Sequence, residues 1–335
     1  MGLAVAGAGA LGRRWVEVLG GLAEVEVKAV VDPLVGGPQA PAWLEDHPAV
    51  EKFSSLDLLP SGHVEAVLVT ASSPAHYKAV KKGLERGLHV LVEKPFATSL
   101  EDARTLVGLA QQRGRTLMVS QNYRFFSGVK AVRELVRTGE LGAVCAVIGQ
   151  FWCNWPGKPY QHAMIHPMAL EMAIHHFDLV RAIFDAEADT GHVIEWNPPG
   201  SPYRFGGGAL EALFSMGSPA GPFPFIYSGS LVSKAPQTPW GGHWRFEFAR
   251  ATLFAEKVEG QYLLFRKKEG GVEATAPFGD DSMAFDQSFR HFFQAVRQGT
   301  EPWCSGRDNL GSLEMALAFN RLPGSPNQAP DLPPS

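Results

Sequence analysis

Along the first third of the chain, short apolar runs alternate with longer stretches that place an apolar residue at every third or fourth position. The runs predict buried strands over residues 3–6, 25–31, 64–70, 88–92 and 116–119. The stretches between them predict helices over residues 10–19, 76–86 and 100–113. Short apolar strands that alternate with helices are typical of a parallel sheet covered on both faces. The pattern therefore predicts a doubly wound α/β domain that ends near Gln121.

The pattern changes after a helix expected over residues 129–137. Longer strands joined by turns rich in glycine and proline are expected over residues 144–151, 209–215, 225–232, 245–254 and 261–267. One strong helix over residues 168–184 lies among them, and two more are expected over residues 285–297 and 307–322. Consecutive strands with short connections indicate a mostly antiparallel sheet. We therefore expect an α/β domain over residues 1–121, an α+β domain over 122–323 and a poorly ordered proline-rich tail over 324–335.

Composition agrees with a two-domain globular protein and excludes several classes of function. The chain has 335 residues, of which 45% are hydrophobic and 19% charged. A net charge of −4 provides no electrostatic basis for binding nucleic acid or an anionic membrane. The three cysteines have no CxxC spacing, which argues against zinc and favours a reducing compartment. We expect a cytoplasmic protein, since no signal peptide or apolar run of about 20 residues is apparent.

The segment from Gly7 to Gly12 reads Gly-Ala-Gly-Ala-Leu-Gly and lies where the first strand meets the first helix. Gly7 permits the tight turn, Gly9 lets a pyrophosphate approach the backbone, and Gly12 lets helix and strand pack closely. Asp32 ends the second strand, where its carboxylate can accept hydrogen bonds from ribose hydroxyls. This combination favours a dinucleotide site over a glycine turn without a ligand. No basic residue follows Asp32 over residues 33–36, so NAD is favoured over NADP.

Two further segments carry residue types suited to acid–base chemistry. Lys94, in Glu93-Lys94-Pro95, lies at the carboxyl end of a parallel strand, and the following proline restricts it to extended conformations and makes a cis peptide a candidate. The competing interpretation is a solvated surface lysine. On the strong helix, the spacing of Glu171, His175 and Asp178 predicts one shared face, with His176 about 100° away. By spacing alone, a functional pair and a surface or core histidine are equally favoured.

These segments resemble the Gfo/Idh/MocA family of oxidoreductases. The resemblance rests on the glycine motif, Glu93-Lys94-Pro95, the stretch from Val119 to Phe125 and the helix EMAIHHFDLVR, which occur in the family's order. It implies an N-terminal Rossmann domain and a C-terminal α+β domain with a large, mostly antiparallel open sheet. It also implies a homo-oligomer, dimer or tetramer, formed through the open sheet face. This chain departs from the family in having Glu171 where aspartate is frequent and Ala173 where glycine is frequent.

The resemblance assigns catalysis to Lys94, Glu171 and His175. A histidine can act as general base near neutral pH, and a lysine can stabilise negative charge on the same oxygen, so the choice of base between Lys94 and His175 is open. The predicted cofactor contacts are Gly7, Gly9, Ala10, Leu11, Gly12, Asp32, Thr70, Ser72, His76, Glu93, Lys94 and Gln121. The predicted substrate contacts are Lys94, Arg124, Trp155, Tyr160, His166, Glu171 and His175. Arg124 has an alternative interpretation, an ion pair with a carboxylate.

The predicted activity is hydride transfer between NAD, or less favourably NADP, and a secondary alcohol or carbonyl of a sugar, cyclitol or related polyol. No metal is expected, because the histidines near residues 162–176 do not form a convincing ligand set and this chemistry needs none. Two alternatives are an enzyme that cleaves glycosides through transient oxidation by bound NAD, and a non-catalytic NAD-binding regulator. Lys94 and His175 argue against the regulator, which needs neither.

Overall fold

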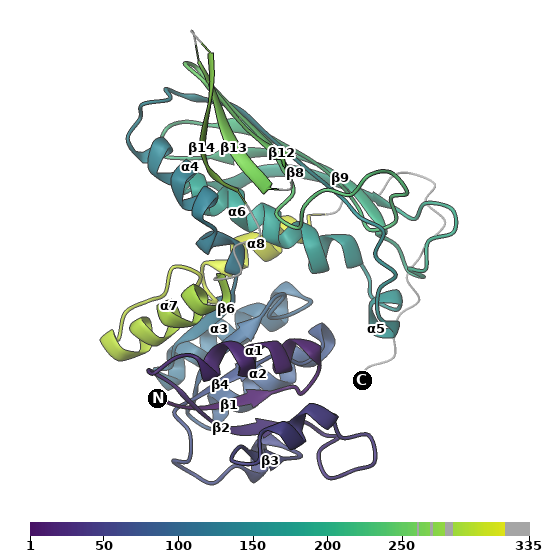
Figure 1. Cartoon of the computed structure of the whole chain (residues 1–335), viewed down its shortest axis with the longest axis vertical. Helices are drawn as coiled ribbons and strands as arrows, with labels where there is room; N and C mark the ends of the chain where they lie inside the picture. The colour runs from purple at the N-terminus through teal and green to yellow at the C-terminus, as the bar shows by residue number, and fades with distance from the viewer. Residues whose placement is uncertain (260, 269–270, 279–283, 319–335) are drawn as a thin grey trace. The chain divides into compact units, whose positions relative to one another are not determined.

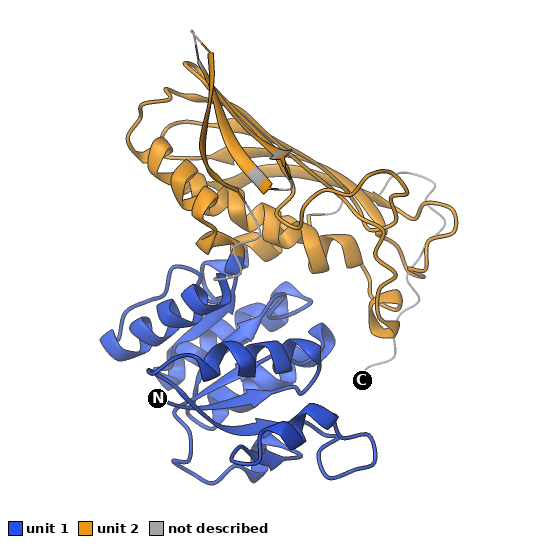
Figure 2. Ribbon diagram, in the orientation of Figure 1, with its two compact units in different colours: residues 1–122, 282–310 blue, residues 123–281, 311–335 orange. Residues whose placement is uncertain are grey.

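The computed structural model describes residues 1–259, 261–268, 271–278 and 284–318. The chain divides into two compact units, shown in Figure 2. Unit 1 contains residues 1–122 and 282–310, and unit 2 contains residues 123–281 and 311–335. From the sequence, we expect contiguous domains over residues 1–121 and 122–323; the division in the structure falls after residue 122, and residues 282–310 belong to unit 1.

Unit 1 is built on a six-stranded sheet in the order β3-β2-β1-β4-β5-β6, in which all neighbouring strands are parallel. The central strands are apolar and buried, as a sheet covered on both faces requires. The strands are β1 (Gly2–Ala6), β2 (Glu26–Val31), β3 (Glu51–Phe53), β4 (Ala66–Val69), β5 (His89–Glu93) and β6 (Leu117–Ser120). The helices are α1 (Ala10–Gly20), α2 (His76–Glu85), α3 (Leu100–Arg113) and α7 (Ala284–Gln298), with 3-10 turns η1 (Ala42–Asp46), η2 (Leu56–Leu58) and η3 (Ser73–Ala75).

Helix α7 belongs to unit 1 because its apolar side packs there. Phe289 and Phe292 are fully buried, and Phe285 meets Trp15 of α1 edge to face with ring centroids 5.0 Å apart. The backbone N–H of Val119 in β6 donates to the carbonyl of Cys304 at 2.9 Å, which joins the following loop to the sheet edge. This long-range packing leaves no local signal in the sequence.

Unit 2 is built on an eight-stranded sheet in the order β14-β13-β12-β11-β7-β10-β9-β8 (Figure 1). Six of the seven strand pairs are antiparallel, and β7 with β10 is parallel. The strands are β7 (Val144–Trp152), β8 (Glu187–Trp196), β9 (Ala209–Gly217), β10 (Phe223–Ser230), β11 (His243–Phe248), β12 (Thr252–Val258), β13 (Gln261–Lys268) and β14 (Gly271–Pro277). The helices are η4 (Asn122–Phe125), α4 (Ser127–Arg137), α5 (Pro159–His162), η5 (Ala169–Ala173), α6 (Ile174–Phe184) and α8 (Asn309–Ala316); η4 and α8 each cross the division between the two units along the chain.

Helix α6 packs on one face of this sheet through aromatic contacts. Phe177 meets the rings of Phe214, Phe225 and Tyr227 edge to face, with centroids 5.2 to 5.9 Å apart. All eleven residues of α6 are buried. A helix that is buried around its whole circumference is part of the core, and it provides a rigid support for polar side chains at its start.

Three expectations from the sequence need correction in unit 2. The strand predicted over residues 245–254 is two strands, β11 and β12, because the chain turns where the Phe248 N–H donates to Ala251 at 2.9 Å. Strands β8 and β14 were not predicted, since their alternation is mostly polar and exposed. The helix predicted over residues 168–184 begins with the π turn η5. The helix predicted over 307–322 is α8, and the end of that range and the tail over 324–335 lie outside the described residues.

Candidate active site

The glycine turn between β1 and α1 has the geometry of a dinucleotide cradle. Gly7 has φ +115°, and a Cβ there would lie 2.5 Å from the backbone nitrogen of Ala71. A Cβ on Gly12 would lie 2.0 Å from the carbonyl oxygen of Gly7. A Cβ on Gly9, the N-cap of α1, would meet nothing within 4 Å. Two glycines are therefore required by packing, while the third borders open space at the positive end of a helix dipole.

Asp32 follows β2 beside this turn. Its Oδ2 accepts a hydrogen bond from the Ala8 N–H at 2.8 Å, and its Oδ1 accepts one from the Leu34 N–H at 2.9 Å. Trp43, which sequence reasoning missed, donates from its indole nitrogen to the Ala8 carbonyl at 2.9 Å. The carboxylate thus lies where a ribose bound against the glycine turn would meet an acceptor.

Among the residues expected to contact the cofactor, Thr70 and His76 bond to backbone within unit 1. Thr70 is buried, and its hydroxyl donates to the Gly7 carbonyl at 2.8 Å. His76 is 1% exposed, with its ring nitrogens 2.7 Å from the Pro95 carbonyl and 2.9 Å from the Ala71 carbonyl. Both side chains therefore support the loops that follow β4 and β5. Ser72, by contrast, is exposed at the N-cap of η3.

The Glu93-Lys94-Pro95 triplet ends β5, and the Lys94–Pro95 peptide bond is cis. Glu93 is 5% exposed and accepts a hydrogen bond from the Trp15 indole at 2.7 Å. Burial raises the pKa of Glu93, and the Trp15 hydrogen bond partly offsets that rise. Gln121 is also buried and donates to Asn309 Oδ1 at 2.9 Å. Glu93 and Gln121 therefore have partners within unit 1. Lys94 is half-buried and lies just after the carboxyl end of strand β5.

In unit 2, Glu171 lies in the π turn and His175 in the first turn of α6. Glu171 Oε2 accepts a hydrogen bond from the Gln161 amide at 3.1 Å. The His175 ring is 6% exposed and stacks on Tyr123, with centroids 4.3 Å apart and planes 11° apart. Neither Gln161 nor Tyr123 was predicted as a site residue, because nothing in the local sequence marks an amide or a ring as a partner of a distant helix.

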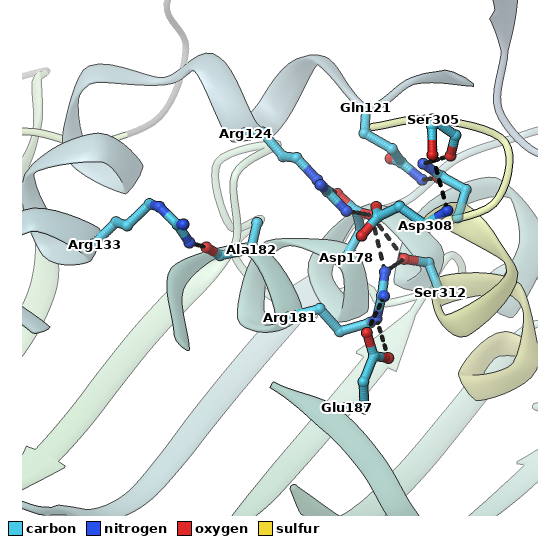
Figure 3. A network of polar contacts seen from close by, with 11 residues as sticks. Gln121, Arg124, Arg133, Asp178, Arg181, Ala182, Glu187, Ser305, Asp308 and Ser312 are labelled. Carbon is cyan, nitrogen blue, oxygen red and sulfur yellow. Dashed lines mark hydrogen bonds and ion pairs between the residues drawn. The ribbon is translucent and has the colours of Figure 1, made fainter. Parts of the chain in front are cut away.

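Asp178 is held in the core by an ion pair. It is 1% exposed, and its two oxygens accept hydrogen bonds from Arg124 at 2.7 and 2.6 Å (Figure 3). Only Glu171 lies in the π turn, where the α-helical spacing on which the prediction relied does not hold, whereas His175 and Asp178 both lie in α6. Arg124 is likewise 1% exposed, so we assign it to this ion pair, its alternative interpretation, rather than to substrate contact.

His176 has a structural environment. Its Nε2 lies 3.0 Å from the Trp240 carbonyl, to which it donates, and its Nδ1 accepts from the Tyr227 hydroxyl at 2.7 Å. These two bonds define the neutral tautomer. Burial lowers the pKa of His176 to about 4.

The segment before the helix brings aromatic and polar side chains together. The Trp155 indole donates to Gln161 Oε1 at 3.2 Å, so Gln161 connects Trp155 with Glu171. Tyr203, also not predicted, donates from its hydroxyl to the Trp155 carbonyl at 3.1 Å. Tyr160 lies on α5 and is half-buried. The structure therefore places Trp155 in one hydrogen-bonded group with Glu171.

His166 is held separately, by Glu195 at the end of β8. The two side chains are 2.5 Å apart between Nδ1 and Oε1, and His166 has a left-handed backbone, with φ +60°. A non-glycine residue in that region is strained, which is common where a side chain must be aimed. Gly207 makes room for the pair, because a Cβ there would lie 2.3 Å from Glu195 Oε2.

The described residues contain neither a metal-binding cluster nor a helix that could span a membrane. No cluster of three or more histidine, cysteine, aspartate or glutamate side chains there has the geometry to hold a metal ion. Over the same part of the chain, no helix has both the length and the apolar composition to cross a membrane.

A doubly wound parallel sheet with this glycine turn defines unit 1 as a Rossmann-type fold, and unit 2 adds a large, mostly antiparallel sheet. Residues 1–121 match the GFO_IDH_MocA family, described as an oxidoreductase family with an NAD-binding Rossmann fold. This match covers the first 121 of the 335 residues, and the similar curated proteins include two that are named as dehydrogenases.

Two relatives and one solved structure illustrate the similarity. D-apiose dehydrogenase of Paraburkholderia graminis is 23% identical over 288 residues, which are 78% of this chain and 71% of that protein. Inositol 2-dehydrogenase 3 of Saccharopolyspora erythraea is 33% identical over 144 residues, 42% of this chain and 41% of that protein. An oxidoreductase from Agrobacterium radiobacter, in complex with NAD+, L-tartaric acid and magnesium, superposes with a TM-score of 0.80 at 19% identity over 95% of both chains. The chain spans about half the length of the first curated relatives that it matches, 48% and 53%.

Proposed function

We propose that the protein is an NAD-dependent dehydrogenase or reductase that acts on a secondary alcohol or carbonyl of a sugar, cyclitol or related polyol. The observation that carries the proposal is the glycine turn, in which Gly7 and Gly12 are closely packed while Gly9 borders open space at the start of α1. The first turn of α1 contains no acidic residue to compete with a pyrophosphate. The residues present therefore fit a dinucleotide.

The preference for NAD over NADP rests on Asp32 and the segment after it. Residues 33–36 are Pro-Leu-Val-Gly and offer no cation for a 2′-phosphate. A carboxylate near that phosphate would repel it. Asp32 would instead accept hydrogen bonds from the two ribose hydroxyls of NAD. When bound, the nicotinamide would accept or supply the hydride.

For the proton, we assign His175 and Lys94. His175 would take the hydroxyl proton as general base, and Lys94 would donate a hydrogen bond to the same oxygen as negative charge develops there. In the reverse assignment, Lys94 takes the proton and His175 donates the hydrogen bond. The pH dependence of turnover in variants of Lys94 and of His175 distinguishes the two assignments. Glu171 would hold a substrate hydroxyl or orient His175, and its bond from Gln161 fixes the carboxylate for either task.

The substrate class follows from the side chains before the helix and from the relatives. Trp155 offers an aromatic face for C–H groups, while Glu171, Tyr160 and His166 offer polar atoms for hydroxyls. Relatives are named as acting on D-apiose and inositol, both rich in hydroxyls. These similarities favour a polyol over an apolar alcohol.

We also propose a homo-oligomer formed through the open face of the unit 2 sheet, in the cytoplasm. Leu213 and Ile226 are 50% and 42% exposed and face each other across β9 and β10, and Ile148 on β7 continues the row. Exposed apolar side chains in one row favour a partner surface. None of the three cysteines forms a disulfide, which suits a reducing compartment.

The test is to follow reduced-nicotinamide absorbance with purified protein, NAD or NADP, and a panel of inositols, aldoses and sugar acids. Net reduction with one polyol would support the dehydrogenase. NAD binding with no net reduction, but release of an aglycone from glycosides, would favour the glycoside-cleaving alternative. Binding of NAD with neither reaction, on the whole panel, would favour the regulator and contradict the proposal.

A further inference from the structure

Tyr123 lies face to face with the histidine that we assign as general base. Its ring is 4.3 Å from that of His175 between centroids, with planes only 11° apart. It also stacks with Phe126, at 4.6 Å and 26°. Tyr123 and His175 are 8% and 6% exposed, so solvent contributes little at this contact. The tyrosine face thus forms a substantial part of the surroundings of the imidazole.

The stack is held by an ion pair at the next residue. Arg124 donates to both oxygens of Asp178, which lies three residues after His175 on α6. The hydroxyl of Ser312 donates to Asp178 Oδ1 at 2.6 Å and itself accepts from Arg181 at 2.8 Å, as Figure 3 shows. The η4 turn is therefore fastened to α6 at two consecutive residues, one by charge and one by ring contact. A bidentate buried pair of this kind allows little rotation.

The stack has a consequence for proton affinity. The face of an aromatic ring carries partial negative charge and stabilises a cation placed over it. His175 becomes a cation when it takes a proton, so Tyr123 favours the protonated form. The charged or titratable groups on η5 and the first turns of α6 include Glu171, bonded to Gln161, Asp178, paired with Arg124, and His176, which bonds to Tyr227 and Trp240.

We propose that Tyr123 is a positioning residue that sets the orientation and proton affinity of His175, with the Arg124–Asp178 pair holding it in place. The proposal rests on the proposed function only in calling His175 the base. Its physical content, a ring that stabilises the imidazolium, can be measured without substrate.

The experiment is an NMR pH titration of the His175 ring in the full-length protein, assigned with His175→Gln, in three forms: wild type, Tyr123→Phe and Tyr123→Leu. Loss of the ring in Tyr123→Leu should weaken proton binding by His175 about 2- to 30-fold. Tyr123→Phe keeps the face and should stay within about 2-fold of wild type. Tyr227→Phe is the matched control, since it changes a tyrosine that contacts His176 instead, and it should leave His175 unchanged.

Two results would overturn the proposal. One is an unchanged His175 titration in folded Tyr123→Leu, and the other is an equal shift in Tyr123→Phe, which would assign the effect to the hydroxyl. If Tyr123→Leu does not fold, the wild-type spectrum decides: His175 ring protons under a tyrosine face must be displaced upfield, and normal positions would refute the stack. Once a substrate is known, the acid limb of kcat/KM should move to lower pH in Tyr123→Leu. If no polyol is oxidised while the NMR shift occurs, the proposed function fails and this inference stands.

Discussion

Replacing Gly9 and Gly12 by alanine, one at a time, separates cofactor binding from packing in a single motif. Both variants add one methyl group, at positions three residues apart. At Gly9 the added Cβ meets nothing within 4 Å, and the backbone, at φ −68° and ψ −174°, suits alanine. Gly9→Ala should therefore fold with wild-type stability to within about 0.5–1 kcal/mol, the loss expected for a weaker N-cap. Its methyl group would occupy the space that a pyrophosphate needs, so the NAD Kd should rise at least about tenfold, or 1.4 kcal/mol.

At Gly12 the same methyl group lies 2.0 Å from the Gly7 carbonyl oxygen, about 1 Å short of the 3.0 Å that Cβ atoms respect. The close atom belongs to the backbone of the glycine turn, and that carbonyl also accepts from Thr70. The start of α1 must move to make room, which costs about 1–3 kcal/mol by analogy with overpacked cores. Gly12→Ala should therefore lower the thermal midpoint of unfolding by several degrees.

The assays are thermal unfolding by circular dichroism and NAD titration by calorimetry, on both variants and wild type. The informative result is the contrast: Gly9→Ala stable but weak in binding, Gly12→Ala destabilised. Wild-type affinity in Gly9→Ala would refute the assignment of that open space to the pyrophosphate. If Gly9→Ala were destabilised as much as Gly12→Ala, the packing argument would be refuted instead.

Three further predictions follow from the site and the sheet. Lys94→Met and His175→Asn should each lower turnover about 10²- to 10⁴-fold in steady-state kinetics, while calorimetry should show that NAD affinity is retained. Full activity in both variants would show that neither side chain takes part in the reaction. Burial lowers the pKa of His176 to about 4, whereas the pKa in the unfolded chain is near 6.5. Between these two values the unfolded chain binds a proton at His176 that the folded protein does not bind. The free energy of unfolding should therefore fall as the pH drops from 6.5 to 4, by roughly 3 kcal/mol over the whole range. Denaturant titrations at pH 7 and pH 4.5 should show this loss in wild type and a smaller one in His176→Gln. Ile226→Lys should reduce the oligomer to a smaller species in sedimentation while leaving the circular dichroism spectrum unchanged, and an unaltered sedimentation coefficient would place the interface elsewhere.

The sequence predicted five of the six strands of unit 1 and helices α1, α2 and α3, because a local pattern marks each of them, whereas the short strand β3 (Glu51–Phe53) was not predicted. The helix α3 begins after Ser99, whose hydroxyl accepts from the Asp102 N–H at 3.1 Å, and ends at Gly114 in the left-handed region. Its predicted bounds, residues 100–113, match the structure. Capping residues and apolar runs act within a few positions, so reading the chain one window at a time is sufficient there.

The errors arose where the decisive contact is distant along the chain. Helix α7 has an amphipathic pattern that predicts a helix but not its unit, and the contact with Trp15 spans most of the sequence. The same holds for β8, whose polar, exposed alternation gives it little strand character until β9 pairs with it. Asp178 is the third case: its role in a core ion pair is determined by Arg124, which lies 54 residues away along the chain.

The candidate site shows the same division between what is local and what is not. Lys94 and His175 are site predictions that rest on residue types able to carry the chemistry and on the motifs that resemble the family. The side chains that orient the groups of unit 2, Tyr123 on His175 and Gln161 on Glu171, are of residue types with no special reactivity. Their contacts fix the angle of a ring and of a carboxylate, which determines how well a base meets its proton. Differences in substrate among proteins with this lysine and histidine should therefore be sought in such supporting residues and in the loop before the helix, rather than in the reactive groups.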